Sequence, residues 1–276
     1  MFHNIYKPHP ALLEYVNNIM VFRFELDPYL PRPEFSFPPL PEQCLYFYPF
    51  ESPDSEYLTL NKKVKLAKNI VVGPQVNRIK LKMHHSNFTV KVGFQPGGLY
   101  RLMGVSMNEF PLDESLDSAY VLDKEISSIN EQMAEVQNPD KLKEIIEVFL
   151  IKKLKVLKNR LPIDQVLPLV LKENGLVHVD HIAELACVSS RQLERLFLQR
   201  VGVSPKFFVR QCRFAKAWVM KENLPNLKWT QIAHSCGYFD QMHLIRDFKV
   251  FCGVLPKVIE NEFNAAPFLL KNQVFY

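Results

Sequence analysis

The chain has 276 residues, 47% of them hydrophobic, and a formal net charge of +5 at pH 7. This length allows two domains of ordinary size, and this apolar content excludes a disordered chain. No apolar run approaches the roughly 18 residues that span a bilayer, and the N-terminal stretch lacks a basic segment followed by an apolar block. We therefore expect a cytoplasmic protein with no membrane partner.

The cysteines predict neither a disulfide framework nor a zinc site. Their number is odd, their spacing is wide and no CxxC occurs, so reduced and packed thiols are expected. Cys44 lies in the apolar stretch CLYFY, which indicates a buried and inert thiol. His84 and His85 are neighbours in a predicted strand, so they would point to opposite faces and share no metal. We expect no metal and no cofactor.

The positive charge is confined to the C-terminal part of the chain. Residues 1–159 contain 19 Lys and Arg and 19 Asp and Glu, whereas residues 160–276 contain 15 Lys and Arg and 10 Asp and Glu. The whole excess of +5 therefore lies in the second part. Such an excess favours a polyanionic partner.

Short β-type runs fill the N-terminal part. Several alternate apolar and polar side chains, as half-buried strands do, and proline and glycine separate them. The runs are residues 18–26, 44–50, 69–74, 78–85 and 88–94. They predict a small barrel or sandwich over about residues 1–120. In the run 44–50, alternation should send only some of the aromatic side chains inward.

After about residue 123 the apolar residues recur with a helical period, and helices are expected to about residue 158. Residues 127–137 and 140–160 predict two helices, with Asn138 or Asp140 capping the second. The apolar face of the second helix contains Leu142, Ile145, Ile146, Phe149 and Leu150, followed by Leu154 and Leu157. This face either packs on its own domain or pairs with a second copy, and the pattern leaves both open. Residues 159–165 then predict a linker.

A repeat dominates the C-terminal part. Residues 193–205 read LERLFLQRVGVSP, and residues 244–256 read LIRDFKVFCGVLP. They share a Leu-x-Arg-x-Phe and a Gly-Val-x-Pro frame at an offset of 51, and Ile182–Ala183 matches Ile232–Ala233 at an offset of 50. A short helix, a tight turn and a second helix with a stop form a helix-turn-helix. Two copies are a far more specific signal than one helical hairpin.

Capping residues support both units. Ser189 or Ser190 can cap the second helix of the first unit, and Asp240 can cap that of the second. Gly202 can end the helix of the first unit, and a proline three residues later can open the next one. The segment 205–223 predicts a single linking helix. About 18 residues of helix span roughly 27 Å, which suits two units that enter major grooves about 34 Å apart.

Several stretches of the sequence resemble a known protein family. The stretches IAELACVSSRQLERLF, GVSP, RQCRFAKA, CGYFDQMHLIRDFK and GVLP resemble the DNA-binding domain of the AraC/XylS family of bacterial transcription regulators. More weakly, PPLPEQCLYFYPF, VVGPQ and VGFQPGGLYRLMGV resemble the cupin-like sensor domain of some members. The predicted fold class is therefore α+β with two domains, an N-terminal β-barrel with following helices and an all-α C-terminal domain.

The resemblance implies a domain order and a set of contacts. A sensor or dimerisation domain covers residues 1–158, the linker 159–165, the DNA-binding domain 166–264 and a tail 265–276. Two reading helices enter successive major grooves of promoter DNA. Their base-contact candidates are Ser190, Arg191, Gln192, Glu194 and Arg195 in the first helix, and Asp240, Gln241, Met242, His243 and Arg246 in the second. The phosphate-contact candidates are Lys206, Arg210, Arg213, Lys249 and Lys257.

Several of these residues have a structural alternative. Arg195 and Arg246 occupy one repeat position, and either could brace the fold through a carboxylate such as Asp247 instead of meeting a base. Met242 is expected to pack on its own unit rather than on a thymine methyl. Arg213 is as well suited to bracing as to phosphate. His243 either meets a phosphate or caps its helix.

The N-terminal domain is less specific. The resemblance implies a regulator that senses a small-molecule effector, at residues the sequence does not identify, and it allows RNA polymerase and a second copy as partners. The alternative is control by a partner protein or by dimerisation without a ligand. A cupin-type enzyme with a helical appendage would need a metal cluster or an acid/base pair, and the sequence offers neither. We therefore expect no enzyme.

Overall fold

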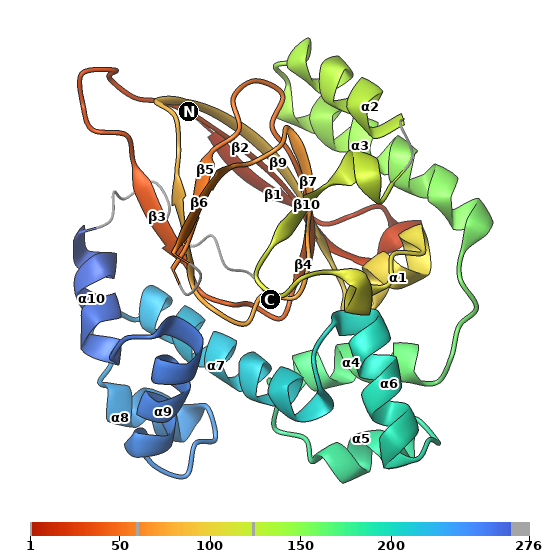
Figure 1. Ribbon diagram of the computed structural model, residues 1–276, viewed down its shortest axis with the longest axis vertical. Helices are drawn as coiled ribbons and strands as arrows, with labels where there is room; N and C mark the ends of the chain where they lie inside the picture. The colour runs from red at the N-terminus through yellow and green to blue at the C-terminus, as the bar shows by residue number, and fades with distance from the viewer. Residues whose placement is uncertain (1, 59–60, 123–124, 266–276) are drawn as a thin grey trace.

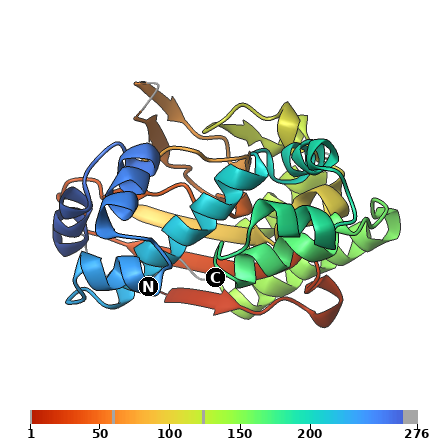
Figure 2. The same ribbon diagram turned by 90° about the horizontal axis from the view of Figure 1, so that it is seen from below.

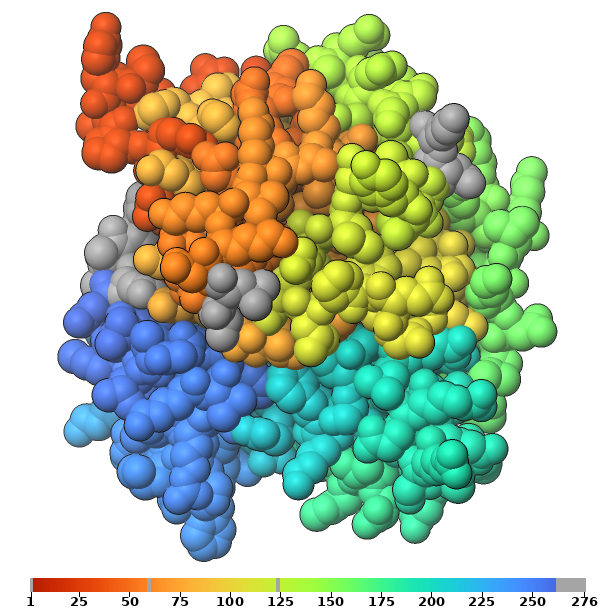
Figure 3. All heavy atoms as spheres, viewed as in Figure 1, coloured from red at the N-terminus to blue at the C-terminus, as the bar shows by residue number. Residues whose placement is uncertain are grey.

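The computed structural model describes residues 2–58, 61–122 and 125–265. A β-rich N-terminal domain lies beside a helical C-terminal domain, and the two touch along one face (Figures 1 and 3). The expected fold class is confirmed. No described helix is long and apolar enough to cross a membrane.

In the part of the chain that the structure describes, ten strands form two antiparallel sheets that face each other. The strands are β1 (Phe2–Tyr6), β2 (Val16–Glu25), β3 (Glu34–Phe37), β4 (Gln43–Phe47), β5 (Asp54–Tyr57), β6 (Lys62–Lys65), β7 (Asn69–Val72), β8 (Ile79–Lys82), β9 (Ser86–Phe94) and β10 (Ser115–Asp117). The larger sheet has the order β1-β2-β9-β4-β7-β10 and the smaller one the order β3-β8-β5-β6. Each run predicted as a strand contains one, although the ladders form two sheets rather than one continuous sheet.

Strict alternation gives the larger sheet two different faces. In β9, Val90 and Val92 point to the helices that cover the sheet, whereas Thr89 and Lys91 point to the smaller sheet. In and after β4, Phe47 joins the helical side while Tyr46 and Tyr48 face the space between the sheets. The predicted partition of these aromatic residues is therefore confirmed.

Helices of the N-terminal domain cover the outer face of the larger sheet (Figure 1). They are α1 (Gly98–Met103), α2 (Glu125–Ala134) and α3 (Pro139–Lys153), with 3-10 turns at Pro10–Leu12, Met107–Glu109, Ser118–Tyr120 and Leu154–Val156. Asn138 caps α3 by accepting from the backbone N–H of Asp140 at 2.8 Å. The helix ends seven residues before the predicted residue 160, at Lys153.

The apolar face of α3 packs on its own domain. Leu142, Ile146, Phe149 and Leu150 are buried in one core with the larger sheet, and Ile145 packs against that core. The interpretation that this face packs on its own domain is therefore confirmed, and pairing with a second copy stays a prediction.

The C-terminal domain consists of seven helices among the described residues. They are α4 (Ile163–Lys172), α5 (Val179–Leu185), α6 (Ser190–Val201), α7 (Pro205–Asn223), α8 (Trp229–Ser235), α9 (Gln241–Cys252) and α10 (Pro256–Ala265). Seen from below, α7 runs between the group of α4, α5 and α6 and the group of α8, α9 and α10 (Figure 2). Residues 163–165 were expected in the linker, but they form the first turn of α4. Asp164 in this turn is buried and pairs with Arg200, which holds the turn against the rest of the protein. Apart from Ala265, the expected tail lies outside the described residues.

Candidate nucleic-acid interface

The two predicted helix-turn-helix units have the same local structure. Helices α5 and α8 have 7 residues each, and α6 and α9 have 12 each. In both turns a residue with positive φ, Cys187 (52°) or Gly237 (69°), reverses the chain. Both longer helices end at a left-handed glycine, Gly202 (80°) or Gly253 (71°), where a Cβ would be strained. The duplication in the sequence is therefore a duplication of structure.

The N-terminus of each reading helix is capped by side chains from the predicted set. Ser189 accepts from the backbone N–H of Gln192 at 3.3 Å, and the side-chain oxygen of Gln192 accepts from the backbone N–H of Ser189 at 3.0 Å. In the second unit Asp240 accepts from the backbone N–H and from Nδ1 of His243, both at 2.8 Å. The backbone bond from His243 is the main reason why the pKa of Asp240 lies below its ordinary value.

The linking helix α7 contributes to the cores of both units. Its first half places Phe208 against Phe197 of α6, with ring centroids 5.8 Å apart. Its second half places Phe214 against Phe248 of α9, at 4.9 Å, and Trp218 in the same cluster. One helix of 19 residues thus fixes how the two reading helices are held.

The first reading helix exposes a charged face. Arg191, Glu194 and Arg195 are exposed, while Leu193 and Phe197 are buried on the opposite side. Ser190 and Gln192 are also exposed, although the oxygen of the Gln192 amide is used in the cap. This face can present guanidinium, carboxylate and amide groups to base edges.

The second reading helix exposes Met242, His243 and Arg246, and Gln241 is half-buried. Met242 is 56% exposed and does not belong to the buried core of its unit, so its role stays a prediction. Leu244 and Phe248 form the buried side of α9. His243 is bound to Asp240, which is the local capping role allowed by the sequence.

Two of the cationic candidates brace the fold. Arg210 pairs with the buried Asp247 through Nη2 at 2.6 Å, and Tyr238 donates to the other oxygen of Asp247 at 3.1 Å. Asp247 is therefore braced by Arg210, and Arg246 stays exposed. Arg213 donates to the carbonyl oxygen of Gly175 at 3.0 Å and lies 5.6 Å from the centre of the Tyr238 ring.

The remaining phosphate candidates lie at the surface. Lys206 and Lys249 are exposed, at the start of α7 and in the last turn of α9. Lys257 is also exposed and pairs with Glu260 at 3.1 Å. None of these placements tests a DNA contact, so the base and phosphate assignments stay predictions.

At one position of the repeat, the two units carry buried side chains of different kinds. The repeat aligns Arg200 with Phe251, and both side chains are buried. Phe251 belongs to the aromatic core of the second unit. Arg200 is 1% exposed and lies 4.7 Å from the centre of the Tyr100 ring of the N-terminal domain. Arg200 was not among the predicted site residues, although an arginine at a core position of a repeat indicates a buried partner.

Arg200 belongs to a buried contact between the domains. Its Nε donates to Oδ1 of Asp164 at 2.5 Å, and Nη1 of Arg101 in α1 lies 3.9 Å from Oδ2 of the same carboxylate. The side-chain amide of Gln43 donates to the carbonyl oxygen of Arg200 at 2.7 Å. Two cations from different domains thus share the buried carboxylate of Asp164.

Two further contacts hold the first unit to the N-terminal domain. Gln211 of α7 donates to the carbonyl oxygen of Gln75 at 2.9 Å. Gly202 lies so close to the loop after β7 that a Cβ there would meet the Pro74 ring at 2.6 Å. Around Gly253, the corresponding residue of the second unit, such a Cβ meets no atom within 4 Å among the described residues beyond its chain neighbours.

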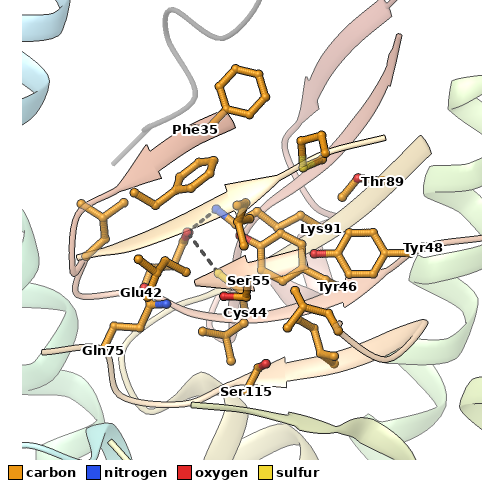
Figure 4. Close-up of a pocket in the computed structure, with 18 of the residues that line it drawn as sticks. Phe35, Glu42, Cys44, Tyr46, Tyr48, Ser55, Gln75, Thr89, Lys91 and Ser115 are labelled. Atoms are coloured by element: carbon orange, nitrogen blue, oxygen red, sulfur yellow. Dashed lines mark hydrogen bonds and ion pairs between the residues drawn. The ribbon is translucent and has the colours of Figure 1, made fainter. Parts of the chain in front are cut away.

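A cavity of about 110 Å³ lies between the two sheets. Its walls are mostly apolar and aromatic, with Phe22, Phe35, Tyr46, Tyr48 and Tyr57 among the lining residues. At one end Glu42 pairs with Lys91 and accepts from Sγ of Cys44, as the dashed lines of Figure 4 show. Gln75 lines the same end.

Burial sets the state of the ionisable groups in this wall. It raises the pKa of the Cys44 thiol far above its ordinary value, and the expected burial of this thiol is confirmed. For Lys91, burial acts to lower the pKa, but the ion pair with Glu42 outweighs it and the pKa is raised. Lys91 is therefore an ammonium inside the domain.

The comparisons with known proteins agree with this architecture. Residues 182–261 match a family model described as a helix-turn-helix domain, and residues 4–114 match one described as a domain of unknown function (DUF6597). Over 83 residues the chain is 34% identical to the HTH-type transcriptional regulator ArgR of Pseudomonas aeruginosa. That match spans 30% of this chain and 25% of the relative's length.

Solved structures of ToxT from Vibrio cholerae are similar over most of the chain. An apo form has a TM-score of 0.49 at 15% identity and covers 88% of this chain and 97% of that chain. A form bound to an unsaturated fatty acid has a TM-score of 0.47 at 11% identity and covers 88% and 94%.

The duplicated units and their shared helix define the C-terminal domain as a double helix-turn-helix DNA-binding domain. The helix-turn-helix character that the sequence resemblance implied is therefore confirmed for this domain.

Proposed function

We propose that the chain is a sequence-specific transcription regulator that reads two successive major grooves of promoter DNA and is controlled by a small molecule in its N-terminal domain. The observation that carries this proposal is the pair of capped reading helices, α6 and α9, packed on one helix. A reading helix that enters a major groove presents the residues near its N-terminus to base edges. In both units that end is capped from within and its outer side chains are exposed.

The dimensions of α7 suit two adjacent grooves. A helix of 19 residues is about 28 Å long, and successive groove entries on one side of DNA lie about 34 Å apart. Arg191 and Arg195 on α6, and Gln241 and Arg246 on α9, are the residues we assign to base edges. Lys206, Lys249 and Lys257 are assigned to phosphates, which position the domain without reading sequence.

Control by a small molecule is supported by the path from the cavity to the first unit. Glu42 lines the cavity, and the next residue, Gln43, holds the carbonyl oxygen of Arg200 at the end of α6. Gln75 lines the cavity at the same end and accepts from Gln211 of α7. A ligand that moves this end of the cavity therefore acts on both α6 and α7.

Selection of genomic fragments by the purified full-length protein tests the proposal. We expect a shared motif of two blocks about one helical turn apart, and loss of enrichment for the Arg191→Ala and Arg246→Ala double variant. A motif with a single block would contradict the two-groove arrangement. No enrichment, with or without candidate effectors, would overturn the assignment as a regulator.

Control by dimerisation or by a partner protein is the second candidate. The outer side of α3 and the 3-10 turn after it supports it, since Val148 and Ile151 in the helix and Val156 in the turn are exposed. Sedimentation of the full-length protein across a concentration series distinguishes the two modes. A contact with RNA polymerase also stays a prediction, tested by transcription in vitro from a selected promoter.

A further inference from the structure

We propose that the cavity between the two sheets takes an uncharged, single-ring aromatic molecule with a hydroxyl or carbonyl oxygen. This inference rests on the proposed control by a small molecule and specifies the chemical class of that molecule. It is carried by the size of the cavity, by the charges of its wall and by one unpartnered hydroxyl group.

The size of the cavity limits the ligand to one ring. Its volume is about 110 Å³, and an apolar protein cavity of about 150 Å³ is known to bind benzene. Aromatic residues from both sheets line it, among them Phe22 and Tyr46 of the larger sheet and Phe35 and Tyr57 of the smaller one. An aromatic ring can gain edge-to-face or offset-stacked contacts with such side chains.

The charges of the wall disfavour an anion. Among the described lining residues, Glu42, Lys91 and Asp113 carry a formal charge, and these sum to −1. Lys91 is already neutralised by Glu42, and both side chains are about nine-tenths buried. A carboxylate brought into this wall would lose its hydration and meet no uncompensated cation, which is costly in a site of low dielectric constant.

A cation is disfavoured for a related reason, because both carboxylates already have their donors. Glu42 accepts from Asn17 at 3.3 Å and from Asn18 at 3.0 Å, besides Lys91 and Cys44. Asp113 accepts from the backbone N–H groups of residues 76 and 77, at 2.6 and 2.7 Å, and from the Asn77 side chain at 2.7 Å. An incoming ammonium would have to displace one of these donors.

An uncharged acceptor has two available partners. Ser55 is 2% exposed, lines the cavity from β5, and its Oγ makes no hydrogen bond to another described residue. Figure 4 shows it near the Lys91 and Glu42 end of the cavity. Lys91 has three N–H donors and its ammonium is held by Glu42. A hydroxyl or carbonyl oxygen on the ring can therefore accept from Lys91, from Ser55 or from both.

Four small aromatic probes, two of them isosteric, test the class of the ligand. Acetophenone and benzoate have the same planar shape and the same number of heavy atoms, and they differ by one negative charge. By titration calorimetry of the full-length protein, we expect acetophenone and phenol to bind, and benzoate and benzylammonium to bind at least about tenfold more weakly. Benzoate or benzylammonium binding as tightly as acetophenone would overturn the proposal, and so would binding of none of the four.

Variants of Ser55 locate the site. Ser55→Leu should fill the cavity and abolish acetophenone binding, and Ser55→Ala, which keeps the space, should weaken it about two- to tenfold. Ser106→Ala, a hydroxyl outside the cavity, should leave binding unchanged. Unchanged affinity in both Ser55 variants would place the site elsewhere and overturn the proposal.

The two proposals fail in different ways. A protein that selects a two-block DNA motif but binds no uncharged ring keeps the proposed regulator function and loses this inference. A protein that binds acetophenone in the cavity but selects no DNA motif keeps the inference and loses the regulator function.

Discussion

Arg200 and Asp164 form a buried ion pair, with Nε 2.5 Å from Oδ1, at the boundary between the two domains. Asp164 also accepts from the backbone N–H of Leu161 at 2.8 Å and faces Arg101 of the N-terminal domain at 3.9 Å. The carboxylate thus joins the start of the helical domain, the end of the first reading helix and the β-rich domain. Removing a partner from this buried carboxylate therefore costs free energy of folding, because the remaining charge stays buried without compensation.

Arg200→Ala should therefore destabilise the protein strongly. Removing one partner of a buried pair costs about 3–5 kcal/mol, because the other charge stays buried without compensation. Arg195→Ala, one turn earlier on the same helix and exposed, is the matched control and should leave the urea midpoint unchanged. The double variant Arg200→Phe and Asp164→Leu, which installs the residue of the second unit, should regain most of the loss. An Arg200→Ala midpoint equal to that of Arg195→Ala would contradict the buried pair.

Gly202→Ala and Gly253→Ala form a second matched pair. Both glycines have positive φ, so both variants carry the strain of a left-handed alanine, about 1–2 kcal/mol. Only at Gly202 does the new Cβ meet another domain, at 2.6 Å from Pro74. We expect Gly202→Ala to lower the free energy of unfolding by about 1–3 kcal/mol more than Gly253→Ala. Equal losses in thermal melts would show that the two units are equally free of the N-terminal domain.

Base reading and phosphate binding should separate by mutation. Arg191→Ala and Gln241→Ala are expected to relax the preference at particular base pairs, each by about 1–3 kcal/mol. Lys257→Ala should weaken binding to all sequences and reduce the slope of log affinity against log salt by about one. Affinity selection with randomised duplexes at two salt concentrations measures both. A base profile unchanged in both of the first two variants would mean that the reading helices are misassigned.

Glu222 should make stability depend on pH. Burial raises the pKa of this carboxyl from 4.5 to about 7. The folded state therefore binds more protons than the unfolded state between these values, so stability falls as pH rises from about 4.5 to 7. At pH 8, Glu222→Gln should raise the free energy of unfolding by up to about 3 kcal/mol, and with it the apparent melting temperature. At pH 4.5 the substitution should change both quantities little.

The exposed Glu173 supplies the control for this pH effect, since Glu173→Gln should leave the melting temperature unchanged at either pH. A Glu222→Gln variant with the same shift at pH 4.5 and pH 8 would show that the carboxyl is not the cause.

Local signals made the helical domain predictable. The repeat fixed the two units, because capping residues, the glycine stop and the apolar stripe all act within a few residues of one another. The start of α4 at Ile163 was not predicted, because Asp164 is ordered by a residue 36 positions away. Helix α3 stops at Lys153 although its pattern continues, which shows that a helical pattern alone does not set the end of a helix.

Long-range pairs could not be read from the chain. Glu42 and Lys91 are 49 positions apart and meet only because β4 and β9 are neighbours in the larger sheet. The alternation of side chains along β4 correctly predicted that only some of the aromatic residues face the space between the sheets. It did not predict the ion pair of Glu42 and Lys91 in the same space. The residues that join the domains have no local pattern either, apart from the single exchange of Phe251 for Arg200 in the repeat.

That exchange makes the two halves of the DNA site unequal. The unit with Arg200 is fastened to the domain that holds the cavity, and at Gly253 the other unit keeps open space where its counterpart is pressed against Pro74. Under the proposed function, one half of an operator is read by the helix that is fastened to the cavity domain, and the other by a helix linked to that domain through α7. Base changes in the first half would alter inducibility, whereas base changes in the second half would alter occupancy alone.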